Sequence, residues 1–316
     1  MHLVQVCNLG SICGGTAACA WTITRALPNW RHTLVFRSAI SLPTIAAFAP
    51  VQTCHGSAFN GSTWTRLKPD IVLLHNTPCQ SVARLPNCPV IDYRHSRTTP
   101  VAADIKLACS EWLRQQLGSD HTDVVLYQPV PRPLRCGHAR QRALRDRPVV
   151  GRICTPTRRK WPDELIPFYE RVASEQPLVD WEFVGCPREL EPELRAACRG
   201  RARFHPAGWQ SRQHLWRWDA LLYHHPTLTE SFGRTVAESL RAGCIPIVDD
   251  RGGFREQVTA ETGFLCATST DFIEAIQQIR DPGRRRQLSR SAQSHGDERF
   301  SLRRFAQDWD RLLRSM

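Results

Sequence analysis

The stretch from Leu228 to Asp249 decides the fold, and it reads Leu-Thr-Glu-Ser-Phe-Gly-Arg-Thr-Val-Ala-Glu-Ser-Leu-Arg-Ala-Gly-Cys-Ile-Pro-Ile-Val-Asp. Its pattern predicts a loop, a short helix that stops at Gly243, and a buried strand over residues 244–248. We expect Ser231 to cap the helix and Gly233 to let a ligand approach the backbone. The start of such a helix presents N–H groups and the positive end of the helix dipole, which together favour a phosphate.

Two carboxylates accompany this helix: Glu230 precedes it and Glu238 lies inside it. Carboxylates do not bind phosphate, but they accept hydrogen bonds from sugar hydroxyls. Phosphate and sugar sites side by side suggest a nucleotide-sugar. The alternative interpretation is an ordinary helix whose two glutamates face water.

The run from Glu230 through Glu238 to Val248 resembles the Glu-x7-Glu segment of the family-4 glycosyltransferases, which are retaining enzymes of the GT-B fold. The resemblance implies an α/β protein with two Rossmann-like domains that face a central cleft, and a C-terminal helix that returns to the first domain. It also implies that Glu230 holds the donor sugar and that Glu238 holds the ribose. The other donor-binding residues implied here are Ser231, Phe232, Gly233, Arg234 and Thr235.

Length and composition favour a soluble protein of two domains. The chain has 316 residues, of which 41% are hydrophobic and 23% charged. It has no run of about 20 apolar residues that could span a membrane. The N-terminus lacks the basic start and apolar core of a signal peptide. We therefore expect a cytoplasmic protein, with peripheral contact at the inner face of the membrane as an option.

Nothing in the sequence predicts a metal or a cofactor other than the donor substrate. The 13 cysteines include no Cys-x-x-Cys pair, so we expect neither a zinc site nor a disulfide framework. His224 and His225 are neighbours in a predicted strand and would point to opposite faces. Asp308-Trp309-Asp310 lies within a predicted helix, where a metal-binding Asp-x-Asp is not expected.

The net charge of +12 is partly concentrated in two arginine-rich segments. They are Arg132, Arg135, Arg140, Arg142, Arg145 and Arg147, and then Arg284, Arg285 and Arg286. Such a surface could attract nucleic acid, anionic lipid or an anionic donor, or it could simply face water. No aromatic interleaving or helix-turn-helix pattern supports nucleic acid. Contact with an anionic membrane surface stays open.

The first half opens with a strand, a glycine turn and a helix, which is the start of a βα unit. Gly14 and Gly15 occupy that turn, and by the resemblance they lie near the donor phosphates. His75 and His95 each follow a buried strand, at the edge where α/β sheets gather ligands. The resemblance places His95 near the donor sugar and the acceptor. Residues 41–62 are interrupted by proline and glycine and are not assigned.

The second half carries cations after its first strand. Arg152 and Lys160 are placed to neutralise a diphosphate, and they resemble the Gly-Arg and Lys-Gly positions of the family. Trp161 stands where the family usually has glycine, so Arg158 could share the role of Lys160. A basic loop that faces water is the alternative.

We therefore predict an N-terminal acceptor-side domain over residues 1–130 and a Pro/Arg-rich linker over 131–148. A nucleotide-sugar-binding domain follows over 149–295, and the last helix, 296–316, packs on the first domain. The predicted function is metal-independent retaining transfer from a nucleotide-sugar to an acceptor that is a glycan, a lipid-linked molecule or a small molecule. The alternative is a catalytically inactive GT-B-like binding or scaffold protein with a basic surface.

Overall fold

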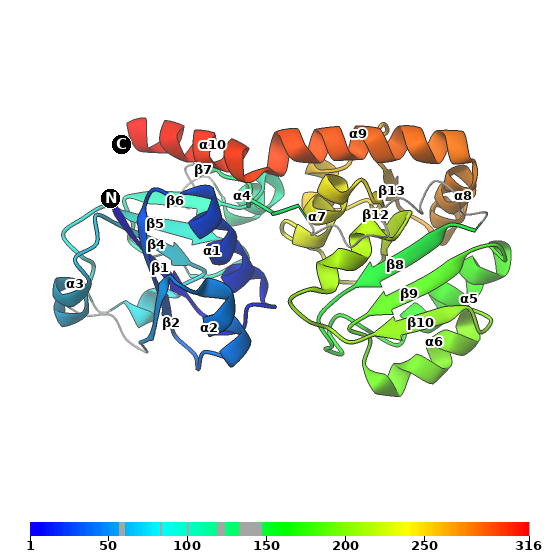
Figure 1. Cartoon of the computed structure of the whole chain (residues 1–316), viewed down its shortest axis with the longest axis horizontal. Coiled ribbons are helices and arrows are strands. Elements are labelled where there is room, and N and C mark those ends of the chain that lie inside the picture. Colours follow the sequence, from blue (N-terminus) through cyan, green and yellow to red (C-terminus); the bar gives the residue numbers. More distant parts are fainter. Residues whose placement is uncertain (57–60, 83, 100, 119–123, 133–146, 316) are drawn as a thin grey trace. The chain divides into compact units, whose positions relative to one another are not determined.

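The computed structural model describes residues 1–56, 61–82, 84–99, 101–118, 124–132 and 147–315 (Figure 1). The chain divides into two compact units, which are Met1–Val130 with Leu302–Met316 (unit 1) and Pro131–Ser301 (unit 2). Most of the predicted linker lies outside the described residues, including Arg135, Arg140, Arg142 and Arg145.

The described part of unit 1 contains a seven-stranded sheet in the order β3-β2-β1-β4-β5-β6-β7, with every pair of neighbours parallel. The strands are β1 His2–Cys7, β2 Arg31–Phe36, β3 Gln52–His55, β4 Ile71–His75, β5 Val90–Arg94, β6 Ile105–Ala108 and β7 Val124–Val125. The strand order reverses between β1 and β4, and ligands of doubly wound sheets bind beside such a reversal. His75 ends β4 at this point.

The helices of unit 1 include one that comes from the far end of the chain. They are α1 Gly15–Ala26, α2 Leu42–Phe48, α3 Gly61–Leu67, α4 Glu111–Leu117 and α10 Leu302–Arg314, with a 3-10 turn, η1, at Cys79–Ser81. The unassigned residues 41–62 contain α2, β3 and the start of α3. Trp309 of α10 is fully buried, parallel to Phe305 at 6.0 Å and edge-on to Trp30 at 6.3 Å.

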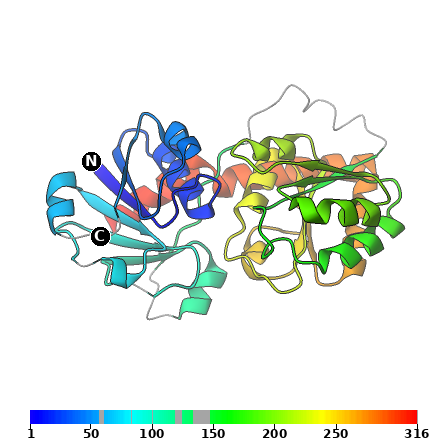
Figure 2. The same ribbon diagram turned by 90° about the horizontal axis from the view of Figure 1, so that it is seen from below.

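Unit 2 repeats the topology with a six-stranded parallel sheet in its described residues, in the order β10-β9-β8-β11-β12-β13 (Figures 1 and 2). The strands are β8 Val149–Ile153, β9 Asp180–Val184, β10 Ala202–His205, β11 Ala220–Tyr223, β12 Ile245–Asp249 and β13 Phe264–Cys266. The order reverses between β8 and β11. The prediction of two Rossmann-like halves is confirmed.

Helices surround this second sheet. They are α5 Leu165–Glu175, α6 Glu191–Ala197, α7 Arg234–Ala242, α8 Ser269–Arg280 and α9 Pro282–Phe300, with 3-10 turns η4 Arg188–Leu190, η5 Ser211–Trp216 and η6 Gly252–Glu256. An aromatic cluster fixes α5 on the sheet: Tyr169 meets Trp181 edge-on at 5.5 Å and Phe183 edge-on at 4.9 Å. Such geometry adds to the free energy gained by burying the rings.

Two features of the C-terminal part differ from expectation. The segment expected as one helix from residue 296 is divided at Ser301, between α9 and α10. Arg285, expected on a basic surface, is buried, and its Nε lies 3.4 Å from Asp219 Oδ1. Burial of the guanidinium is tolerated because the carboxylate balances its charge. Among the described residues, no helix combines the length and apolar character needed to cross a membrane.

Candidate functional site

Helix α7 starts two residues later than a Ser231 cap would require. Its N-cap is Gly233, in the left-handed conformation with φ 81° and ψ 62°. A Cβ on Gly233 would lie 2.3 Å from Phe254 Cε1, so only glycine fits this turn. The predicted cap by Ser231 is therefore wrong, and the close approach at Gly233 is made by a ring of the protein. The predicted stop is confirmed, because Gly243 ends the helix at φ 65°.

The segment before α7 is held by a glycine pair, Gly252 and Gly253, which the sequence did not single out. A Cβ on Gly252 would lie 2.5 Å from the Glu230 carbonyl oxygen, and one on Gly253 would lie 2.3 Å from the Ser231 carbonyl oxygen. The Gly253 N–H donates to the Glu230 carbonyl at 3.0 Å. This packing fixes the backbone from which the Glu230 side chain projects.

Glu230 is the centre of a polar cluster. The Lys160 ammonium donates to Glu230 Oε1, and the Tyr223 hydroxyl donates to the same oxygen at 2.5 Å. The side chains of Lys160 and Glu230 are 13% and 23% exposed, so the pair stays within reach of a ligand. Burial raises the pKa of Glu230, but the Lys160 charge and the hydrogen bonds from Lys160 and Tyr223 together outweigh it, so the net pKa is lowered. The carboxylate is thus ionised at neutral pH.

Hydrogen bonds from Arg152 hold the loop that carries Lys160. Arg152 of β8 is fully buried, and it donates to the carbonyl of Lys160 at 2.8 Å and to that of His224 at 2.7 Å. Its guanidinium carbon lies 5.0 Å from the Trp161 ring centre and 4.9 Å from that of Tyr223. Buried in this way, Arg152 positions the Lys160 loop instead of projecting toward a ligand.

His225 fastens the same loop. Its Nε2 donates to the Arg159 carbonyl at 2.8 Å, and its Nδ1 accepts from the Leu228 N–H at 2.8 Å. His224 differs from its neighbour: its Nδ1 lies 2.7 Å from Asp249 Oδ1, and its ring stacks on Phe168. Both residues follow β11, which ends at Tyr223, so the strand is shorter than predicted.

Arg158 lies apart from the Glu230 cluster. Its side chain is 56% exposed, and it pairs with Asp163 at 2.7 Å and Glu189 at 3.7 Å. Trp161, which replaces the usual glycine of the family, is a fully buried core residue. Of the two candidate cations, Lys160 is therefore the one that contacts Glu230.

The remaining candidates of unit 2 lie on or beside α7. Glu238 is 8% exposed, and its Oε1 lies 3.6 Å from Arg212 and 3.7 Å from Arg234. The alternative of a water-facing glutamate is thus wrong. The Phe232 ring is buried and meets Phe300 edge-on at 5.8 Å, so it contributes to the core. Thr235, in the first turn, is half-buried.

In unit 1, the glycine turn precedes α1. Gly14 is the N-cap of that helix, and its N–H donates to the Ser11 carbonyl at 2.9 Å. Gly15 is the first helical residue, and a Cβ there would meet no atom within 4 Å. The open space beside Gly15 leaves the start of α1 accessible.

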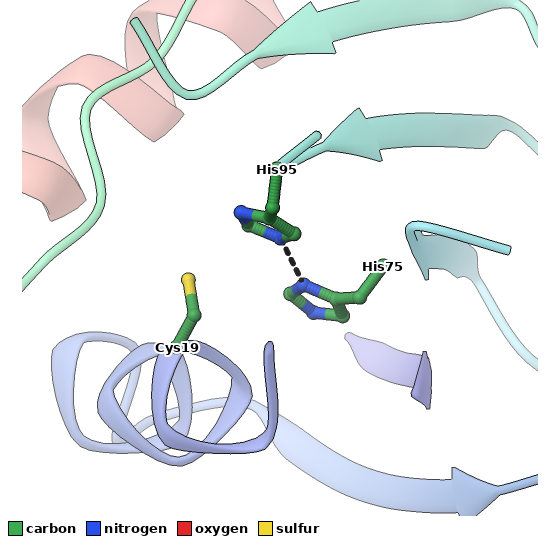
Figure 3. A group of neighbouring side chains, drawn as sticks. All are labelled: Cys19, His75 and His95. Atoms are coloured by element: carbon green, nitrogen blue, oxygen red, sulfur yellow. Dashed lines mark hydrogen bonds between the residues drawn. The ribbon is translucent and has the colours of Figure 1, made fainter. Parts of the chain in front are cut away.

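His75 and His95 face one another beside Cys19 of α1 (Figure 3). Their rings are nearly parallel, at 8°, with centres 5.2 Å apart, and His75 Nδ1 lies 2.9 Å from His95 Nε2. His75 Nε2 lies 3.0 Å from Gln5 Oε1, and His95 Nδ1 lies 2.8 Å from Gln128 Nε2. The sequence singled out both histidines but neither glutamine.

The hydrogen-bond partners assign the protons of both rings. Gln5 Oε1 only accepts, so His75 Nε2 carries a hydrogen and His75 Nδ1 accepts from His95 Nε2–H. His95 Nδ1 then accepts from the Gln128 amide. Burial lowers the pKa of His75 to about 3. The His75 imidazole is therefore neutral at pH 7, and the hydrogen bonds with His75 and Gln128 hold the His95 ring in one orientation.

Comparisons with known proteins agree with this architecture. Residues 149–295 match the family model described as glycosyl transferases group 1. The chain is similar in structure to HepE from Anabaena, solved with UDP and glucose, at TM-score 0.77 and 18% identity over 100% of both chains. It is also similar to a sucrose-phosphate synthase from Thermosynechococcus elongatus, at TM-score 0.74 and 15% identity over 100% of this chain and 99% of that one.

A third similar structure is the apo form of WaaB, a lipopolysaccharide outer core galactosyltransferase, at TM-score 0.65 and 14% identity over 100% of this chain and 99% of that one. No curated protein sequence matches the chain. The predicted GT-B fold is confirmed. Residues 149–295 match the glycosyl transferases group 1 model within a chain of the GT-B fold, and the two findings together support a glycosyltransferase.

Proposed function

We propose that the chain transfers a sugar from a nucleotide-sugar to an acceptor held by unit 1, with retention of the anomeric configuration. The observation that carries the proposal is the cluster of Lys160, Glu230 and Tyr223. It lies where the strand order reverses between β8 and β11, beside the start of α7. This is where open α/β sheets bind nucleotides.

The diphosphate of the donor is assigned to Lys160 and to the start of α7. The ammonium supplies a positive charge, and the first turn of α7 adds backbone N–H groups and the helix dipole. Arg152 acts through the Lys160 carbonyl that it holds. Charge that is fixed before the reaction is commonly the largest catalytic contribution. It stabilises the departing diphosphate, so we propose that the chemistry proceeds without a metal.

The two glutamates are assigned to hydroxyl groups. Within the described residues, both hydrogen bonds to Glu230 end on Oε1, which leaves Oε2 to accept from a donor-sugar hydroxyl. Glu238, held between Arg212 and Arg234, is assigned to the ribose. We assign no covalent nucleophile, since an ionised Glu230 paired with Lys160 is a weak one. Front-face substitution by the acceptor, as the resemblance implies, then gives retention.

The residues of unit 1 are assigned to the acceptor side. The His95 ring is held by His75 and Gln128, so it can orient a hydroxyl of the sugar or the acceptor. The open space beside Gly15 leaves room near the backbone at the start of α1. HepE was solved with UDP-glucose, so UDP-sugars are the first donors to test.

The test is release of the nucleoside diphosphate from a panel of UDP-, GDP- and ADP-sugars, with and without acceptors. We expect one donor class to be turned over and to raise the melting temperature. Lys160→Ala and Glu230→Ala should both lower turnover, and unchanged turnover in both contradicts the assigned site. A donor that stabilises the protein but is never turned over supports the inactive binding protein instead.

A further inference from the structure

A second polar cluster lies in unit 2, apart from the Glu230 cluster. It consists of Glu182 on β9, His205 at the end of β10 and His214 in η5. Glu182 Oε2 lies 3.4 Å from His205 Nε2 and 3.4 Å from His214 Nδ1. The two imidazole centres are 4.4 Å apart. The side chains are 4%, 27% and 18% exposed in the order given.

The two ring nitrogens that face Glu182 lack hydrogen-bond partners. Both His205 Nε2 and His214 Nδ1 are buried and unpaired among the residues that the structure describes. Buried polar atoms are nearly always paired, so two such atoms aimed at one oxygen require an explanation. Two lone pairs that face a carboxylate repel it unless a proton or a cation lies between them.

The distances between the ring nitrogens and Glu182 fit a bridging cation better than a direct charge-assisted hydrogen bond. A charge-assisted hydrogen bond from imidazolium to carboxylate spans about 2.7–2.9 Å. A tetrahedral zinc with bonds of about 2.0–2.1 Å separates its ligand atoms by about 3.3–3.4 Å, which is the edge of the tetrahedron. Both observed separations are 3.4 Å. The three ligand atoms all lie within 4.8 Å of one another.

We propose that Glu182, His205 and His214 bind a divalent transition-metal ion of the zinc type, with a water as the fourth ligand. Trp218 Nε1 donates to Glu182 Oε2 at 2.7 Å and so orients the carboxylate, as outer partners of metal ligands do. The ion joins β9, β10 and η5. Because η5 also carries Arg212, which lies 3.6 Å from Glu238, the ion stabilises the segment beside the proposed ribose site.

A competing group in unit 1 is the set of Cys19, His75 and His95, whose ligand atoms also lie within 4.8 Å of one another. There, His75 and His95 already bond each other, and Gln5 and Gln128 satisfy their outer nitrogens. Metal binding there would break these hydrogen bonds. At Glu182, in contrast, a metal would give His205 Nε2 and His214 Nδ1 the partner that they lack. The ion is therefore assigned to the Glu182 group.

The positive charge of Arg217 should weaken the binding of a metal ion at this site. Arg217 Nη2 donates to Glu182 Oε1 at 3.4 Å, and its side chain is 33% exposed. A nearby guanidinium opposes a cation, so Arg217→Gln should tighten metal binding several-fold. A purely structural hydrogen-bonded cluster predicts no such gain.

The experiment measures metal bound to the full-length protein after chelator treatment and reloading with Zn²⁺. We expect about one ion per chain and a rise in melting temperature of about 5 °C at a hundred times Kd. His205→Gln and His214→Gln should each weaken binding by at least about tenfold. His55→Gln, in unit 1, serves as the matched control and should leave binding unchanged.

The absorption spectrum of bound Co²⁺ distinguishes the two candidate groups in the wild-type protein, so this test does not depend on whether a variant folds. Co²⁺ bound by nitrogen and oxygen ligands absorbs in the visible range, and a thiolate ligand adds a charge-transfer band in the near ultraviolet. Visible absorption without that band supports the Glu182 site. Absence of binding, or binding that is lost in Cys19→Ala and retained in His205→Gln, overturns the proposal.

Discussion

Lys160 and Glu230 form the contact on which the proposed chemistry depends, because one supplies charge to the diphosphate and the other holds the sugar. Removal of the ammonium in Lys160→Ala should lower kcat by about 10²–10³-fold, the effect of losing one preorganised charge-stabilising group. Arg158→Ala is the matched control, since Arg158 pairs with Asp163 at an exposed position. It should change kcat less than about twofold. Steady-state kinetics with the best donor measures both, and an equal loss in the two variants would contradict the choice of Lys160.

His75 makes a separate prediction about acid stability. Its pKa in the folded protein is about 3, whereas an unfolded histidine titrates near 6.5. Between these values the unfolded state binds the extra proton, so stability falls as the pH is lowered from about 6.5 toward 3, by about 1.4 kcal/mol per pH unit. In His75→Gln, the free energy of unfolding should depend less steeply on pH, by that slope. Urea unfolding at pH 6.5 and pH 5 measures the difference, and parallel pH profiles for variant and wild type would refute the assigned burial effect.

The sequence identified Lys160 and Glu230 because residue type and spacing carry their chemistry, but it could not identify their contacts. Tyr223 reaches Glu230 only because β11 ends beside β8, which is a property of the sheet. Ser231 has the side chain of a cap, yet Gly233 takes that position because the chain must turn against Phe254. Contacts of this kind depend on tertiary packing.

Helix α7 depends on a glycine at its start. In Gly233→Ala, the new Cβ meets Phe254 at 2.3 Å, and the residue must keep a φ of 81°. We expect a loss of about 2–4 kcal/mol in the free energy of unfolding, from the left-handed backbone and the overlap together. Chemical denaturation measures it.

Variants of two other glycines separate the cost of the left-handed backbone from the cost of the overlap with Phe254. Gly200 also has a positive φ, of 76°, but a Cβ there meets no atom within 4 Å, so Gly200→Ala should cost only about 1–2 kcal/mol. Gly15 is helical and equally open, so Gly15→Ala should be neutral or slightly stabilising. If Gly233→Ala costs no more than Gly200→Ala, the contact with Phe254 is not tight.

At the scale of elements, the buried strand after α7 was predicted well and the segment with short elements poorly. Residues 244–248 were expected as a buried strand, and β12, Ile245–Asp249, is buried throughout. Residues 41–62 hold two seven-residue helices, one of them extending past the segment, and a four-residue strand. Pro43 sits in the first turn of α2, where proline is tolerated, although in the sequence it reads as a breaker.

The division into two units could be inferred from composition, but the return of the chain to unit 1 could not. The Pro- and Arg-rich break near residue 131 coincides with the boundary between the units. In contrast, α10 joins α1 across more than 270 residues of sequence, and only the resemblance suggested it. Periodicity shows that a helix has an apolar face and does not show which surface covers that face.

This assignment of α10 leads to a prediction about how the molecule unfolds. Trp309 of α10 is fully buried in unit 1, and Trp181 of β9 is 1% exposed in unit 2. Replacement of either by alanine should cost about 3–5 kcal/mol through lost burial and a residual cavity. In differential scanning calorimetry, Trp309→Ala should lower the transition of unit 1 and Trp181→Ala that of unit 2.

The same calorimetric experiment shows which unit binds the donor. If Lys160 and Glu230 hold the nucleotide-sugar, saturating donor should raise the transition that Trp181→Ala lowers, because a ligand stabilises the folded state that binds it. The shift should be lost in Lys160→Ala, a variant of unit 2, and retained in His55→Gln, a variant of unit 1. A donor that raised only the transition lowered by Trp309→Ala would place the nucleotide site in unit 1 and refute the assignment to the Glu230 cluster.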